Sequence, residues 1–149
     1  MTYLLDTNVV SEWVRPRPDP GVMAFLSSTD EDLLFLSVIT LAELRRGVER
    51  LPSGRRRAAL NDWLEDDLSQ RFDGRILGVD APVAGIWGRI MAREQRGGRT
   101  PGVMDVWIAS IAEARGLILV TRDTTDFTPL VGRVFNPWGT SGQGRTPSG

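Results

Sequence analysis

The chain has 149 residues, of which 41% are hydrophobic and 25% are charged, a composition typical of one globular domain with a single core. It has no histidine, cysteine or lysine, and all 18 basic residues are arginines. These absences exclude catalysis by imidazole, thiol or amine groups and leave carboxylates, hydroxyls and any metal that carboxylates hold. The formal net charge of −1 gives no global attraction to nucleic acid, so a polyanionic substrate would need a local patch or a metal ion.

The first third of the sequence alternates apolar runs with helical patterns. Asp19 followed by Pro20 is typical of a helix start, with a cap and then proline at the first helical position. The expected elements are a strand over Thr2–Leu5, a helix over Thr7–Val14, a helix from Pro20 to about Ser28, a strand over Leu33–Leu36 and a helix from Thr40 to about Leu51.

The rest of the chain continues this alternation. Val103–Ala114 is apolar nearly all round, so this helix should be central and buried. Trp63, Trp87 and Trp107 occupy core positions of helices, and we interpret them as packing residues rather than base-stacking platforms. The expected elements are a helix capped by Ser53, a strand over Arg75–Val79, a helix from Asp80 to the break at Gly97-Gly98, the helix over Val103–Ala114, and strands over Leu117–Val120 and Arg133–Phe135.

Strands that alternate with helices predict an α/β fold with a central parallel sheet covered by helices on both faces. We expect one domain over residues 1–138 and a disordered tail over residues 139–149, which are rich in Gly, Ser and Thr. Sites in such sheets form at the carboxyl ends of strands. Asp6 and Asp123 each follow a predicted strand, so two acids separated by most of the chain should meet at one edge.

The sequence favours a cytoplasmic protein. No apolar stretch approaches the roughly 20 residues of a membrane span. The N-terminus enters a strand-like run without the basic segment of a signal peptide, and there is no cysteine. We interpret the one basic run, Arg55–Arg57, as the solvated face at a helix start.

Acidic residues stand at the ends of several hydrophobic segments. Asp6 closes the first strand, where it could cap the next helix, bind a metal or do both, because a helix N-terminus favours an anion. Glu43 follows Thr40 at the spacing of a capping box, so a purely structural role is open for it. Asp105 starts the most apolar helix, where a charge is costly unless it is paired or bound to metal, although it too could be a helix cap.

Asp123 and Asp126 both follow the fourth strand. One of them should face the site, and the sequence does not choose between them. Oxygen-only ligands select hard divalent ions such as Mg2+ or Mn2+. A carboxylate cluster without other catalytic groups therefore points to metal-assisted hydrolysis of phosphodiester bonds.

Five segments of the chain carry a family resemblance. They are Leu4–Glu12, Leu36–Gly47, Met104–Ala109, Leu119–Phe127 and Phe135–Trp138. Their order and spacing resemble the PIN-domain superfamily, and specifically the VapC-type toxins with their FitB-like relatives. One such segment would be a weak signal, whereas five in order are a strong one. The Pro-Gly-Val before Met104 departs slightly from the usual pattern, which concerns substrate access more than chemistry.

The resemblance implies a three-layer α/β/α sandwich with about five parallel strands and an endoribonuclease that depends on Mg2+ or Mn2+. We expect Asp6 and Asp105 to be direct metal ligands, while Glu43 and Asp123 bind a second ion, act through water or orient the nucleophile. The family's site acids fall on Asp6, Glu43, Asp105, Asp123 and Asp126.

The resemblance also implies a cognate VapB-like antitoxin, a homodimer of the toxin and a hetero-oligomer of the two proteins. We expect the antitoxin to pack near Trp13, Phe25 and Leu44 and to insert a basic side chain among the acids. Three arginines are close enough in sequence to the acids to contact phosphates or a partner's acids. They are Arg45, Arg46 and Arg122.

Other acidic α/β domains fit the sequence less well. A response-regulator receiver or a haloacid-dehalogenase-type phosphatase needs a lysine near its site, which this chain lacks, and the phosphatase also needs Asp-x-Asp where the chain has Asp6-Thr7-Asn8. An alternative function is a FitB-like binding module that acts in a DNA-binding repressor complex with its antitoxin and has little nuclease activity. The presence of all the acids favours a working nuclease.

Overall fold

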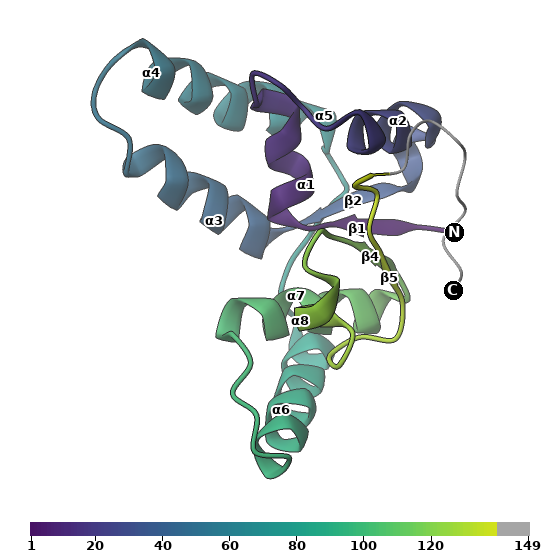
Figure 1. The fold of residues 1–149 in the computed structure, drawn as a ribbon. Coiled ribbons are helices and arrows are strands. Elements are labelled where there is room, and N and C mark those ends of the chain that lie inside the picture. The colour runs from purple at the N-terminus through teal and green to yellow at the C-terminus, as the bar shows by residue number, and fades with distance from the viewer. Residues whose placement is uncertain (140–149) are drawn as a thin grey trace.

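The computed structural model describes residues 1–139 and contains one sheet of five strands in the order β3-β2-β1-β4-β5, with every pair parallel (Figure 1). The predicted parallel α/β/α architecture is confirmed. Most of the expected tail, residues 140–149, lies outside the described part of the chain. The strands are β1 (Tyr3–Leu5), β2 (Leu34–Ser37), β3 (Ile76–Leu77), β4 (Ile118–Val120) and β5 (Val134–Phe135).

Helices cover both faces of the sheet, and Figure 1 shows α1 to α5 on one side and α6 to α8 on the other. On the first side lie α1 (Thr7–Ser11) with a 3-10 turn (Glu12–Val14), α2 (Pro20–Ser28), a second 3-10 turn (Glu31–Leu33), α3 (Val38–Glu49), α4 (Arg55–Asp62), a π-helical turn (Trp63–Leu68) and α5 (Ser69–Arg71). On the second side lie α6 (Ala81–Arg96), α7 (Val103–Arg115) and α8 (Thr124–Phe127).

Two hydrophobic cores result from the alternation of side chains along the strands. Tyr3 and Leu5 of β1 pack into the core under α1 to α5, whereas Leu4 packs into the core under α6 and α7. Val120 and Leu119 of β4 divide between the two cores in the same way. The central strands are buried on both faces, which fixes their register and therefore the positions of the residues that follow them.

Two predicted helix starts are wrong. The helix expected from Thr40 begins at Val38, because the side chain of Ser37 caps it by accepting the backbone N–H of Thr40 at 3.1 Å. Thr40 and Glu43 therefore do not form a capping box. The next helix was expected to be capped by Ser53, but its N-cap is Gly54, which offers no side-chain acceptor.

The helix over Val103–Arg115 is buried only from its second turn onward. Val106 and Ile108 are buried, whereas Val103 and Met104 are 55% and 39% exposed, so the expectation of a fully buried helix is wrong for its first turn. Gly116 ends this helix in the left-handed conformation, with φ of 65°, as glycine permits at such a position.

The tryptophans pack as predicted. The rings of Trp87 and Trp107 stack with centroids 4.9 Å apart, and Trp63 packs against the first core. Among residues 1–139, no helix is long and apolar enough to cross a membrane.

Candidate active site at the carboxyl edge of the sheet

The predicted meeting of distant acids occurs where β1 and β4 end. These neighbouring strands place Leu5 beside Val120, and the backbone N–H of Asp6 donates to the Val120 carbonyl at 2.9 Å. One residue further, the Thr121 hydroxyl donates to Asp6 Oδ2 at 2.7 Å. The sheet register thus fixes the Asp6 carboxylate at the edge.

Asp6 is a buried acid that forms no ion pair with any cation of residues 1–139. It is 6% exposed, and burial raises its pKa from 3.8 to about 6, with smaller contributions from the negative charges of Glu43 and Asp105. The hydrogen bonds from Thr121 and from the Thr7 N–H, at 2.8 Å, lower this pKa only in part. A proton or a metal ion would therefore stabilise the carboxylate at neutral pH.

Thr7 links Glu43 to Asp6 by donating a hydrogen bond to each carboxylate. The Thr7 hydroxyl donates to Glu43 Oε1 at 2.6 Å, and the same residue's N–H donates to Asp6. The Thr7 hydroxyl also lies 3.1 Å from the Thr40 hydroxyl one turn before Glu43. Because Ser37 caps α3, the Glu43 carboxylate is not used as a cap and faces the first helix of the chain.

Asp105 lies in the first turn of α7, whose N-cap Gly102 makes no side-chain hydrogen bond. Burial raises the pKa of Asp105, and repulsion from Asp126, Glu43 and Asp123 raises it further. No contact acts in the opposite direction on this carboxylate. The helix N-terminus alone favours its charged form.

The two acids between which the sequence did not choose both lie near Asp105. Asp123 occupies the N-cap position of α8 without capping it, and it accepts the Asn8 side-chain N–H at 3.2 Å. Asp126 is in the first turn of α8 and has the largest effect of any charged residue on the pKa of Asp105. The structure therefore places both acids in the cluster.

No arginine neutralises this cluster in the described part of the chain. The ion pairs among residues 1–139 include none of the five acids. Arg45, which we expected near the site, contacts Asn61, Glu49 and Glu65 instead. The Arg122 guanidinium lies 5.5 Å from the centre of the Trp138 ring.

The donor set fits a hard divalent ion. Within residues 1–139, no three acids are gathered tightly enough to enclose a metal by themselves. Mg2+ does not need such an enclosure, because it commonly keeps several waters and uses one or two carboxylates together with substrate phosphates. Asp6 and Asp105, both with raised pKa values and mutual repulsion, match that mode of binding.

Sequence reasoning missed the polar side chains that position these acids. Asn8 bonds Asp123, and Thr121 bonds Asp6 while also accepting the backbone N–H of Asp123 at 3.0 Å. Only their positions in the sequence could have indicated these two residues, since Thr121 directly follows β4 and Asn8 lies two residues after Asp6. Their partners are more than 110 residues distant in the chain, so only the strand order could identify them.

An ion pair between an exposed arginine and a buried carboxylate holds the loop before Asp105. Glu94 is 3% exposed, and its carboxylate accepts from Arg99 Nε at 2.9 Å and from Arg99 Nη2 at 3.3 Å. These bonds hold the pKa of Glu94 below its usual range. Because the Arg99 N–H also donates to the Glu94 carbonyl, the pair closes the turn that leads to α7.

Comparison with known proteins identifies the family. Residues 3–128 match the family model described as PIN domain. The chain belongs to the PIN-domain family. This PIN domain is 42% identical over 135 residues to Toxin FitB of Neisseria gonorrhoeae, which covers 91% of this chain and 97% of that protein. It is 36% identical over 135 residues to VapC ribonuclease Y4jK of Sinorhizobium fredii, covering 91% and 96% of the two chains.

Solved structures agree with the family assignment. The PIN domain superposes on FitAcB from Neisseria gonorrhoeae with a TM-score of 0.87 and 41% identity, covering 93% of this chain and 99% of that chain. It superposes on FitAB bound to an IR36 DNA fragment with a TM-score of 0.86 and 39% identity, covering 92% and 96%. The predicted resemblance is confirmed.

Proposed function

We propose that this PIN domain is a divalent-metal-dependent endoribonuclease and the toxin of a type II toxin-antitoxin system. The observation that carries the proposal is the group of five acids at the carboxyl edge, which forms no ion pair among residues 1–139 and in which burial and the neighbouring negative charges raise the pKa of Asp6 and of Asp105. The name of the relative VapC ribonuclease Y4jK supports the reaction class, and so does that of the tRNA(fMet)-specific endonuclease VapC of Shigella flexneri, which is 32% identical over 138 residues.

The residues divide the chemistry among them. Asp6 and Asp105 would hold the ion, Mg2+ or Mn2+, which when bound would lower the pKa of water and stabilise charge on the phosphate. Glu43, which accepts the Thr7 hydroxyl, would orient a water and accept its proton. Asp123 and Asp126 would hold further waters or a second ion beside Asp105. Asn8 fixes the Asp123 carboxylate.

A groove next to Glu43 is our proposed binding site for an antitoxin. It has a volume of about 410 Å³, lies between α1, α3 and α4, and is lined by Thr7, Glu43, Leu44 and Trp63 among others. The expected contacts at Trp13 and Phe25 are less suitable, because Arg71 covers the Trp13 ring and Phe25 packs between two aromatic rings. An amphipathic segment in the groove could extend a basic side chain to the acids.

A repressor complex is compatible with this function. The FitAB structure, which resembles this chain, was determined with a DNA fragment, and it favours a second role in which toxin and antitoxin together bind DNA. We propose that a homodimer of this PIN domain joins its antitoxin in such a hetero-oligomer. Sedimentation of the chain alone and with its antitoxin tests the assembly.

A cleavage assay tests the nuclease directly. The chain should cut labelled structured RNA with Mg2+ and not with EDTA, and Asp105→Asn should abolish the cut. Asp67→Asn, which removes an exposed acid from the π-helical turn, is the matched control and should behave like the wild type. Cleavage that survives both EDTA and Asp105→Asn would contradict the proposed function.

A further inference from the structure

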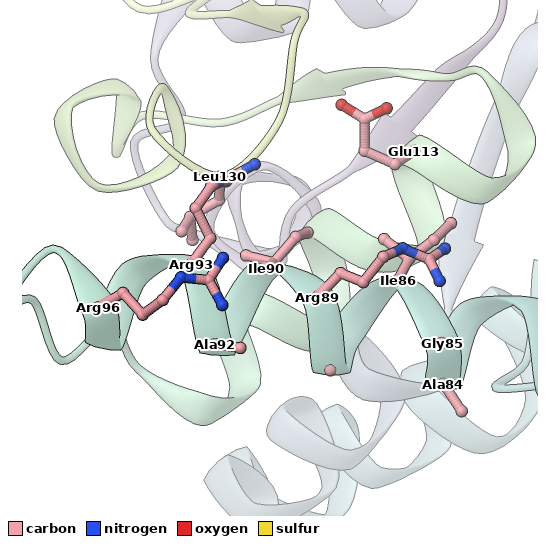
Figure 2. A pocket seen from close by; sticks show the side chains of 11 residues that line it. Ala84, Gly85, Ile86, Arg89, Ile90, Ala92, Arg93, Arg96, Glu113 and Leu130 are labelled. Carbon is pink, nitrogen blue, oxygen red and sulfur yellow. The ribbon is translucent and has the colours of Figure 1, made fainter.

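A groove on α6 contains an unusual concentration of positive charge for a chain with a net charge of −1. It has a volume of about 740 Å³ and lies between α6, the last turn of α7 and the segment after α8. Figure 2 shows Arg89, Arg93 and Arg96 along α6, with Leu130 and Glu113 across the groove. All three arginines are exposed.

The arginines in this groove are largely free of internal partners. Neither Arg89 nor Arg96 forms an ion pair or side-chain hydrogen bond with another residue of the described chain. Arg93 is the exception. Its Nε forms an ion pair with Glu94 Oε2 at 3.4 Å, and its Nη2 donates to the Pro129 carbonyl at 2.8 Å, which orients its guanidinium beside the turn after α8. The one acid in the lining, Glu113, is engaged by the Gly132 N–H at 2.8 Å.

Three small residues on α6 reduce the bulk of the helix surface in this groove. Gly85, Gly88 and Ala92 also line the groove, so a bulky charged group could approach the helix closely. A Cβ on Gly85 would lie 3.5 Å from Arg89 Nη1, which shows that the guanidinium lies back along α6. Planar guanidinium groups arranged in this way bind phosphate oxygens in pairs.

We propose that this groove binds the phosphate backbone of RNA outside the acidic site. The proposal rests on the ribonuclease function proposed above. It extends the substrate contact past α8, the helix of Asp126, because Arg93 bonds the carbonyl three residues after that acid. Sequence-independent contacts of this kind position the RNA and supply affinity.

The lining favours RNA over a protein. The most exposed large hydrophobic residues of the described chain, such as Val103 and Met104, lie outside this groove. Of the large apolar residues in its lining, Ile90 and Leu130 are buried and Ile86 is partly exposed, so the groove offers a protein little of the apolar anchor that dominates interfaces. A second copy of the chain would bring arginine against arginine across a two-fold axis. The phosphates of RNA, in contrast, need only the positive charge of the arginines to bind.

The test compares two double variants of the full chain with equal charge. Arg89→Gln with Arg96→Gln removes the free groove arginines, and Arg17→Gln with Arg50→Gln removes two exposed arginines elsewhere. Binding of a labelled 20-nucleotide single-stranded RNA is measured by fluorescence anisotropy in EDTA, at several salt concentrations. We expect the groove variant to bind roughly 10-fold more weakly, with a salt slope lower by about 1.4, and the control variant to bind much as the wild type does.

Cleavage is then measured separately, so that the two proposals can fail independently. The groove variant should show a raised KM with an unchanged kcat on the structured RNA of the cleavage assay in Mg2+. Equal binding losses in both double variants would overturn the groove. So would a groove variant that binds RNA normally but changes its sedimentation or its binding of a polyglutamate peptide. A chain that binds RNA through the groove yet never cuts it would contradict the nuclease alone.

Discussion

Two of the buried carboxylates in the described chain, Glu94 and Asp6, differ in how their charge is compensated. Glu94 on α6 is 3% exposed and accepts hydrogen bonds from Arg99 and Arg93, which hold its pKa below the usual range. Asp6 at the end of β1 is 6% exposed and has only a hydroxyl and a backbone N–H as donors, so burial raises its pKa to about 6.

The difference separates structural acids from candidate functional ones. A buried charge that is fully paired stabilises a local turn, as Glu94 does before α7. A buried charge left among other acids costs free energy that the rest of the fold must offset, and it marks a functional site more often than a structural one.

Replacing Asp6 should have opposite effects on activity and stability. Asp6→Asn should lower RNA cleavage on the order of 100- to 1000-fold, since it removes a proposed metal ligand. Without metal it should also raise the free energy of unfolding at pH 7. A rise in pKa from 3.8 to about 6 corresponds to about 3 kcal/mol, from which a lost acceptor removes about 1 kcal/mol.

The sign of the pH dependence follows from the raised pKa. Between pH 3.8 and about 6 the folded wild type holds this proton more tightly than the unfolded chain does, so its stability falls as the pH rises through that window. The gain from Asp6→Asn should therefore be complete above about pH 6 and absent below about pH 3.8. Urea unfolding at several pH values in EDTA measures the change in the free energy of unfolding. A loss of stability in Asp6→Asn at pH 7 would show that the buried Asp6 charge does not destabilise the folded chain.

Glu43 should affect activity and leave stability nearly unchanged. Glu43→Gln keeps an oxygen to accept the Thr7 hydroxyl, so the contact between α1 and α3 survives. We expect cleavage to fall roughly 10- to 100-fold because the proton acceptor is lost. Thermal melting and cleavage rates on the same preparation decide the point, and normal cleavage would assign Glu43 to structure alone.

The ion pair of Glu94 and Arg99 should affect catalysis only by positioning the turn that leads to Asp105. Arg99→Ala breaks the bonds to Glu94 and frees the turn before Asp105, so we expect a fall in kcat of about 10-fold with little change in KM. Arg17→Ala, an exposed arginine outside any described ion pair, is the control. A lowered melting temperature with normal kcat would confine the pair to a structural role.

Much of the fold could be predicted from the sequence because its signals are local. Neighbouring residues determine the apolar runs of β1 and β4, and they also determine the cap of α6 at Asp80. The start of α3 was misplaced because Thr40 and Glu43 have the spacing of a capping box, whereas Ser37 forms the actual cap. Local propensity cannot decide between two adjacent caps when the end of the preceding strand sets the choice.

The acids of the candidate site could be predicted from the sequence, whereas the polar residues that hydrogen-bond to these acids could not. Asp6 and Asp123 follow strands, and strand ends of a parallel sheet share one edge. That Thr121 holds Asp6 and Asn8 holds Asp123 depends on β1 and β4 being neighbours, which no local pattern specifies. Asp123, the N-cap residue of α8, and Asp126 in its first turn both lie near Asp105 because they are only three residues, about one helical turn, apart.

The most direct measurement is the melting temperature of the metal-free chain at pH 7 as MgCl2 is added. An acid cluster that lacks a cation should bind the ion in the folded state, so the wild type and Asp67→Asn should melt a few degrees higher with saturating dependence on Mg2+. Asp105→Asn should start at a similar or higher melting temperature and fail to respond. Equal responses of all three proteins, or none from the wild type, would contradict a metal site at the carboxyl edge.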